Sequence, residues 1–213
     1  MHGVKRGVFI SFEGVEGSGK TTQAKALVDW LAASKLPHVF VRDPGSTHIG
    51  ERIRDVLLDN QSRGMHAKCE VLLFLAARSQ LTYEIILPAL REKKIVVTDR
   101  FADSTLAYQC HARGLPQRLV SVMNRFAAAG LKPDLTFLID IDVEKRKERG
   151  KFEDRMETEA EGYHRKVRRA YEVLAGRSKK RFRVICGEMP INVVHAEVIR
   201  HVEDILSRKG YRL

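Results

Sequence analysis

Residues 12–23, FEGVEGSGKTTQ, contain the spacing Gly-x-x-x-x-Gly-Lys-Thr, which is typical of loops that hold the phosphates of a nucleotide. Glycines let the backbone turn so that several N–H groups point at the phosphates, and the following helix adds the positive end of its dipole. In this pattern Lys20 would reach the β- and γ-phosphates, and the Thr21 hydroxyl would bind Mg²⁺. We therefore expect a nucleoside triphosphate to bind along Gly14, Val15, Glu16, Gly17, Ser18, Gly19, Lys20, Thr21 and Thr22.

Glu16 is an unexpected residue in such a loop, because a carboxylate repels phosphate. A loop that only hydrolysed the triphosphate would gain nothing from it. The acid could instead serve a second substrate that accepts the γ-phosphate, or it could be a solvent-facing side chain paired with a cation. The loop alone does not distinguish a hydrolase from a kinase, so this distinction depends on other residues.

The phosphate loop needs a strand before it and a helix after it. The apolar run Val8–Phe12 predicts the strand, and apolar residues at helical spacing from Ala24 to Leu31 predict the helix. Further strands are predicted at Val39–Val41, Ile95–Thr98, Leu135–Ile141 and Phe182–Cys186. Further helices are predicted near Ile49–Leu57, Ala67–Gln80, Leu81–Glu92, Pro116–Ala129, Tyr163–Leu174 and Val194–Ser207. This alternation predicts an α/β P-loop NTPase fold, a five-stranded, mainly parallel sheet flanked by helices, in one domain over residues 1–213.

Composition narrows the class of protein. The three cysteines, Cys69, Cys110 and Cys186, are far apart and odd in number, which argues against a disulfide framework or a zinc site. The N-terminal apolar run is too short for a signal peptide, and no stretch approaches the roughly 20 apolar residues that span a bilayer. We expect a cytoplasmic protein with no membrane partner.

The net charge of +11 is concentrated in residues 144–183, which hold fifteen Lys and Arg against eight Asp and Glu. Such a segment can bind nucleic acid or a polyphosphate, or it can be a solvated helix face. Its cations alternate with acids, and no aromatic stacking platform accompanies them. We therefore expect no nucleic-acid partner. A nucleic-acid-binding ATPase is the competing hypothesis from a different functional class.

Cations and an aromatic residue suit a second substrate that carries a phosphate and a base. Arg42 and Arg100 each follow an apolar strand, where a parallel sheet opens its ligand crevice, and arginine can engage two phosphate oxygens. Each could equally form a surface salt bridge. Phe74 and Arg78 lie four residues apart on one predicted helix and could stack on and hydrogen-bond a base, although Phe74 alone would suit core packing.

The motifs carry a family resemblance. RDPG at 42–45, LFLAAR at 73–78, DRFADSTLAYQ at 99–109 and PDL at 133–135 follow the phosphate loop in this order. Together they resemble thymidylate kinases of the bacterial type over nearly the whole chain. The resemblance implies transfer of the γ-phosphate of MgATP to dTMP, giving dTDP and ADP for dTTP synthesis, by an enzyme that forms a homodimer. A kinase for another nucleoside monophosphate is the closest alternative.

The resemblance also implies roles for single residues. Phe74 would stack on thymine, Arg78 would bind its exocyclic oxygen, and Tyr108 would crowd the place of a ribose 2′-hydroxyl. Glu16 would accept a hydrogen bond from the 3′-hydroxyl of dTMP. The full dTMP set implied is Glu16, Arg42, Phe74, Arg78, Arg100, Ser104, Tyr108 and Gln109. Asp99 would lie near Mg²⁺, directly or through water; its alternative role is to cap the next helix.

A mobile lid at about residues 146–158 would supply a catalytic cation, because the phosphate loop has Gly17 where some family members have arginine. DRME at 154–157 resembles the bacterial lid motif, so Arg155 is the first choice and Arg149 the second. On this interpretation, Arg155→Ala would lower kcat about 10³-fold or more with little change in fold. The implied catalytic set is Lys20, Asp99, Arg100, Arg155 and Arg149.

Three departures from the family pattern leave specificity open. Ser46 replaces a glycine and would be strained if its φ is positive. Cys110, His111 and Ala112 replace glycines in a predicted loop near the acceptor, which leaves the strictness for dTMP open. Cys-Gly-Glu at 186–188 differs from the usual residues beside the adenine, which leaves the donor preference open.

Overall fold

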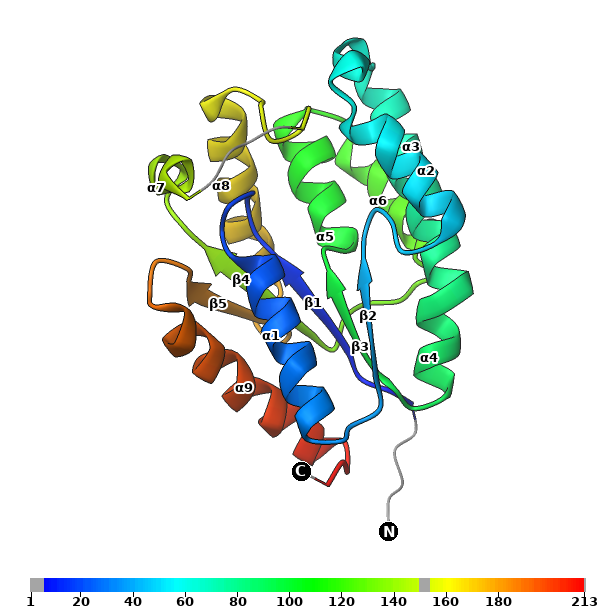
Figure 1. Cartoon of the computed structure of the whole chain (residues 1–213). Helices are drawn as coiled ribbons and strands as arrows, with labels where there is room; N and C mark the ends of the chain where they lie inside the picture. Colours follow the sequence, from blue (N-terminus) through cyan, green and yellow to red (C-terminus); the bar gives the residue numbers. More distant parts are fainter. Residues whose placement is uncertain (1–5, 150–153, 213) are drawn as a thin grey trace.

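The computed structural model describes residues 6–149 and 154–212, and these form one layered α/β unit (Figure 1). Its sheet contains β1 (Phe9–Glu13), β2 (His38–Arg42), β3 (Ile95–Asp99), β4 (Leu135–Asp140) and β5 (Phe182–Cys186). Their order is β2-β3-β1-β4-β5, and every neighbouring pair is parallel. The sequence prediction of the fold class is confirmed, and each strand lies within one residue of its predicted ends.

The register brings the carboxyl ends of the central strands together. Phe12 of β1 pairs with Asp99 of β3, and Asp99 pairs with Arg42 of β2. Because β1 lies between β3 and β4, the loop that follows it opens at the middle of this edge. Ligands bind at this edge of open parallel sheets, so the sheet alone places the phosphate loop beside both predicted arginines.

Helices cover both faces of the sheet because its strands are apolar on both sides. On one face α1 (Lys20–Ala33) and α9 (Ile191–Arg208) pack against residues such as Ile10 and Phe137 (Figure 1). On the other face α4 (Leu87–Arg91) packs against Phe9, and α8 (Glu161–Arg177) packs against Leu138. Consecutive residues of β1, Phe9 and Ile10, therefore belong to hydrophobic cores on opposite faces of the sheet.

The remaining helices lie in several places around the sheet. They are α2 (His48–Leu58), η1 (Asn60–Gly64), α3 (Ala67–Leu81), η2 (Thr82–Ile86), α5 (Ala102–Thr105), η3 (Leu106–Ala112), α6 (Gln117–Ala127) and α7 (Val143–Glu148). Among them, α2, α3 and α6 lie together, and α7 lies beside α8 (Figure 1). The prediction of a loop at residues 110–112 is wrong, because these residues form the end of the π-helix η3. Cys110 is buried there against Val71 and Leu75, so packing rather than glycine content sets the backbone.

The continuous helical stretch Ala67–Arg91, which comprises α3, η2 and α4, is long and apolar enough by length and composition to cross a membrane. It is the one such stretch among the described residues, and it differs from the expectation that no segment would reach this length. Its residues Leu81, Ile86 and Leu90 are buried against the sheet residues Phe9 and Val96. These apolar residues of the stretch thus contribute to the hydrophobic core of the fold.

Candidate functional site

The phosphate loop joins β1 to α1 and depends on its glycines. Gly14, Gly17 and Gly19 have φ of 144°, 74° and 92°, values that favour glycine. A Cβ on Gly14 would also lie 2.5 Å from the carbonyl oxygen of Ile139. The loop therefore keeps its shape because side chains are absent at these positions, and α1 starts at Lys20 directly behind it.

One pocket opens on the α9 side of the loop. It is lined by Gly17, Ser18, Gly19, Lys20, Thr21, Thr22, Gln23, Ile139, Arg149 and residues 187–191 and 194. A Cβ on Gly187 would lie 2.6 Å from Ile141 Cγ2 and 2.8 Å from Ile139 Cγ2. The glycine of the Cys-Gly-Glu departure therefore stands at a closely packed position. We call this pocket the donor pocket, after the nucleoside triphosphate that the sequence predicts along residues 14–22.

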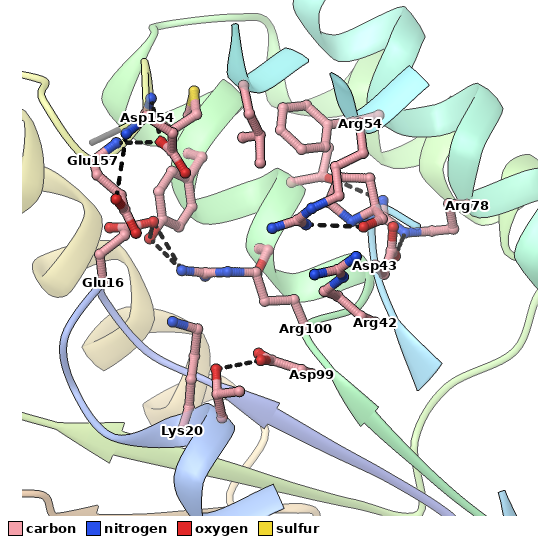
Figure 2. Close-up of a pocket in the computed structure, with 18 of the residues that line it drawn as sticks. Glu16, Lys20, Arg42, Asp43, Arg54, Arg78, Asp99, Arg100, Asp154 and Glu157 are labelled. Carbon is pink, nitrogen blue, oxygen red and sulfur yellow. Dashed lines mark hydrogen bonds and ion pairs between the residues drawn. The ribbon is translucent and has the colours of Figure 1, made fainter. Parts of the chain in front are cut away.

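A second pocket opens on the other side of the loop, and all eight of the predicted acceptor residues line it (Figure 2). They are Glu16, Arg42, Phe74, Arg78, Arg100, Ser104, Tyr108 and Gln109. Lys20 and Thr21 line both pockets. Two ligands, one in each pocket, would therefore meet at these two side chains.

Arg100 and Glu16 form the centre of the second pocket. Arg100 Nη2 donates to Glu16 Oε1 at 2.8 Å and to the Tyr108 hydroxyl oxygen at 3.0 Å, and the Tyr108 hydroxyl donates to Glu16 Oε1 at 2.7 Å. His164 Nδ1 lies 3.3 Å from Glu16 Oε2. Burial alone would raise the pKa of Glu16, but Arg100 and then the His164 contact hold that pKa below its usual range. Glu16 is 8% exposed, so it is not the solvent-facing acid of the alternative prediction.

Arg78 lies at the bottom of the second pocket and is 1% exposed. Its Nε donates to Asp43 Oδ2 at 2.6 Å, its Nη1 donates to Thr105 and Asn124, and its Nη2 donates to the Phe101 carbonyl oxygen. These contacts use four of the five N–H groups of an arginine, so one remains for a ligand. Phe74 is half-buried and lines the pocket instead of belonging to a core cluster, which disfavours its core-packing alternative.

Arg42 lies at the mouth of the pocket and is held by Glu51, whose Oε2 is 2.9 Å from Arg42 Nη2. Ser46 has φ of 65°, so the glycine replacement is strained as predicted. Two contacts offset the strain: the Arg42 N–H donates to Ser46 Oγ at 2.7 Å, and the Ser46 N–H donates to Glu51 Oε1 at 2.5 Å. The loop therefore keeps its shape without the glycine.

Sequence reasoning missed Arg54, which points into the second pocket from α2 (Figure 2). Its Nη1 donates to the Pro44 carbonyl oxygen at 2.9 Å. Burial lowers the pKa of Arg54, and the nearby Arg42 lowers it further, as expected where cations gather around a site for an anion. Arg54 sits on an amphipathic helix with other charges, so its type and spacing gave no signal.

The residues that could hold a divalent cation are Thr21 and Asp99. The Thr21 hydroxyl donates to Asp99 Oδ2 at 2.5 Å, while Asp99 Oδ1 is buried and has no hydrogen-bond partner among the described residues. An unpaired carboxylate oxygen beside a hydroxyl fits Mg²⁺, which takes one or two protein oxygens and completes its shell with phosphates and water. Asp99 is not the cap of the next helix, because α5 has Phe101 at that position.

The two lid arginines occupy different places, and the order of preference predicted for them is not supported. Arg155, the first choice, is 4% exposed; its Nη1 donates to Glu70 Oε2 at 2.7 Å and its Nε to the Leu57 carbonyl oxygen at 2.9 Å. It lines neither pocket around the phosphate loop. Arg149 lines the donor pocket, where its Nη1 donates to the Gly187 carbonyl oxygen at 2.7 Å. Residues 150–153 of the predicted lid lie outside the described residues.

Glu70 explains why Arg155 lies away from the phosphate loop. This fully buried carboxylate also accepts hydrogen bonds from Arg113 and Gln109. Burial alone would raise the pKa of Glu70, but Arg113 above all lowers it. A buried charge needs partners, so the Glu70 carboxylate, which lies in α3, holds Arg155 there.

Comparisons with known proteins agree with this arrangement. The family model described as "Thymidylate kinase" matches residues 12–198. Thymidylate kinase of Pelotomaculum thermopropionicum is 45% identical over 206 residues, covering 95% of each chain. That of Kosmotoga olearia is 41% identical, covering 97% of this chain and all of the relative. The crystal structure of thymidylate kinase from Ehrlichia chaffeensis superposes with a TM-score of 0.77 at 34% identity, covering 92% of this chain and 98% of that one. The family model and these relatives show that the chain belongs to the thymidylate kinase family.

Proposed function

We propose that the chain transfers the γ-phosphate of ATP to dTMP, giving dTDP and ADP, with the residue roles that follow. The activity is that of its family. The observation that supports the geometry is that Lys20 and Thr21 line both pockets. A donor in one pocket and an acceptor in the other would place the γ-phosphate and the acceptor phosphate on either side of Lys20. Holding two reactants in line in this way lowers the barrier to a two-substrate reaction.

For the acceptor, we propose that Phe74 stacks on thymine, and that Arg78 uses its remaining N–H for the exocyclic oxygen of the base. Ser104 and Gln109 line the base and sugar region. Tyr108 closes the space beside the sugar, where a ribose 2′-hydroxyl would lie. Each of these side chains lines the second pocket.

For the acceptor phosphate, we propose Arg42 and Arg100, joined by Arg54 from α2. Glu16 accepts a hydrogen bond from the 3′-hydroxyl, which gives the acid in the phosphate loop a role in orienting the acceptor. Its buried contact with Arg100 and Tyr108 supports this role, because the three groups face one pocket.

For the donor, we propose that residues 14–22 hold the phosphates of ATP and that Thr21 and Asp99 hold Mg²⁺, Asp99 directly or through water. The ion would neutralise charge on the β- and γ-phosphates. Lys20 neutralises charge on the oxygens of the transferred group. Burial lowers the pKa of Lys20, and Arg100 lowers it further, so the ammonium is poised to gain from an arriving anion.

For the lid, at about residues 146–158 of a single domain, we propose Arg149 as the cation that reaches the transferred phosphate. Its place in the donor pocket supports it over Arg155. Closure of this segment over bound ATP would exclude water and favour transfer over hydrolysis.

The proposed function is tested by measuring ATP turnover with each deoxy- and ribonucleoside monophosphate, with single-stranded DNA, and with no acceptor. We expect dTMP to give by far the highest kcat/KM, and turnover without an acceptor to be low. Fast turnover with dUMP or a purine monophosphate would favour the closest alternative, a kinase for another monophosphate. Stimulation by DNA but not by dTMP would point instead to a nucleic-acid-binding ATPase.

We also propose that the protein is a homodimer in the cytoplasm. An apolar stripe at helical spacing, Leu119, Val122 and Phe126, is exposed on α6, and Phe126 is 81% exposed. The neighbouring helices α2 and α3 add the exposed residues Ile49, Val56 and Leu72. An apolar patch of this kind marks a surface that is covered by a partner.

Replacing Phe126 by glutamate is expected to convert the dimer to a monomer, because it places a charge within this patch. The molar mass from light scattering after size exclusion would show the change. Val184→Glu is the matched control, since Val184 is also exposed but lies on the edge strand β5. A wild-type chain that elutes as a monomer at micromolar concentration would contradict the proposal.

A further inference from the structure

Glu13 is the other acid of the FEGVEG segment, and the proposed reaction gives it no role. It ends β1, directly before the phosphate loop, and is fully buried. Its Oε1 accepts a hydrogen bond from the Phe101 N–H at 2.8 Å. Its Oε2 accepts from the Ser104 hydroxyl at 2.5 Å and from the Tyr171 hydroxyl at 2.8 Å. Three donors, two from residues 101–104 and one from α8, thus converge on one carboxylate.

The same two hydroxyls contact Arg100. Arg100 Nη1 donates to Ser104 Oγ and to the Tyr171 hydroxyl oxygen, both at 3.2 Å. A hydroxyl has a single hydrogen, so one that donates to Glu13 presents its lone pairs to other donors. The two hydroxyl oxygens also lie 2.8 Å apart, so each could donate to the other. A charged carboxylate only accepts, so Glu13 favours the arrangement in which both hydroxyls donate to it and accept from the guanidinium.

The backbone of Arg100 is held by the same carboxylate. Arg100 has φ of 70°, a strained conformation for a residue other than glycine, and such strain persists only where neighbours hold it. The Phe101 N–H, which follows Arg100 directly, donates to Glu13 Oε1. The Arg100 N–H donates to the Phe12 carbonyl oxygen at 2.9 Å, one residue before Glu13. Side chain and backbone of Arg100 are thus both fixed on the end of β1.

Glu13 does not suit a purely structural role. Burial and then Asp103 raise the pKa of Glu13 to about 7, even though Ser104, Arg100 and Tyr171 act to lower it. A carboxyl group that is buried beside another acid is costly to ionise, and an apolar side chain would fill the space more cheaply. Groups perturbed in this way concentrate at functional sites.

We propose that Glu13 is a positioning residue for Arg100. Through the Ser104 and Tyr171 hydroxyls and the Phe101 amide, it fixes the guanidinium so that its remaining donor, Nε–H, faces the acceptor phosphate. Both Nη groups are already engaged, Nη1 by the two hydroxyls and Nη2 by Glu16 and Tyr108. The inference rests on the proposed role of Arg100 in binding dTMP.

The test is a double-mutant cycle of Glu13→Gln and Arg100→Lys. Glutamine keeps the size of Glu13 but turns one oxygen into an amide donor, so the two hydroxyls lose their fixed direction. We expect kcat/KM for dTMP to fall about tenfold to a hundredfold, the range typical of residues that orient a binding group, while KM for ATP stays within twofold. Because Glu13 acts through Arg100, the double variant should be no worse than Arg100→Lys alone.

Tyr171→Phe is the second variant, in case Glu13→Gln does not fold. It removes one of the two acceptors for Nη1 and should lower kcat/KM for dTMP in the same direction, whereas Tyr83→Phe, at an exposed tyrosine, should not. Thermal unfolding of each variant reports on the fold.

Several outcomes would overturn the inference. These are additive effects in the cycle, equal losses for ATP and dTMP, or wild-type kcat/KM in both Glu13→Gln and Tyr171→Phe. If Arg100→Lys itself leaves KM for dTMP unchanged, the proposed role of Arg100 fails, and the inference about Glu13 fails with it. If only the inference about Glu13 is wrong, Arg100→Lys is still impaired with dTMP, so the two results can be distinguished.

Discussion

Replacing Arg149 by alanine is expected to lower kcat about 10³-fold, the smaller end of the range for arginines that stabilise a transferred phosphate. Arg149 lies in the donor pocket and shares it with Lys20, so its guanidinium is a lid cation that already lies beside the phosphate loop. Since its role is to stabilise charge that develops during transfer, KM for ATP should change much less than kcat. Steady-state kinetics with saturating dTMP would measure both.

Arg155→Ala is the matched comparison within the same lid. Removing Arg155 leaves Glu70 buried with fewer partners, which should cost stability on the order of 3 kcal/mol or less, because Arg113 and Gln109 remain. We expect a lower Tm and a loss in kcat below tenfold. Arg177→Ala, at an exposed arginine that ends α8, should change neither quantity. A 10³-fold loss in Arg155→Ala with a small loss in Arg149→Ala would reverse the assignment and show that the lid moves Arg155 away from Glu70.

Replacing Lys20 by methionine is expected to lower kcat about 10²- to 10³-fold, the effect of removing one charge-stabilising donor from an active site. Methionine keeps most of the length of lysine, so the packing of α1 should be retained. Lys20 is 8% exposed and lines both pockets, which places its ammonium group where donor and acceptor meet. The loss should therefore appear with ATP and dTMP both saturating.

Lys25→Met is the control for Lys20→Met, because Lys25 is exposed on the same helix and lines neither pocket. Its kcat should stay within twofold of wild type, and both variants should unfold at similar temperatures. If Lys20→Met keeps more than a tenth of wild-type kcat, Lys20 is not a main stabiliser of the transferred phosphate, and the role would pass to the backbone of the loop and to Arg149.

The fold was largely predictable because its signals are local. A run of apolar residues such as Ile95–Thr98 fits a strand buried on both faces, and such a strand needs no distant partner to be identified. Predictions were weaker where packing overrides propensity. Residues 106–112 form π-helical turns because Ala107 and Cys110 are buried, and a local pattern does not reveal that burial.

The candidate site likewise has one part that the sequence predicts and another part that depends on packing. The amino-acid sequence by itself determined the phosphate loop, the strand ends that place Asp99 and Arg100 beside it, and the family, because these depend on residue types at fixed spacing along the chain. Tertiary structure alone decided which long side chains reach the site. Arg155 pairs with Glu70, 85 residues away, while Arg149 turns to the donor pocket. An arginine has several rotatable bonds and a charge that must be paired where it is buried, so its position follows from the partners that the fold brings near it.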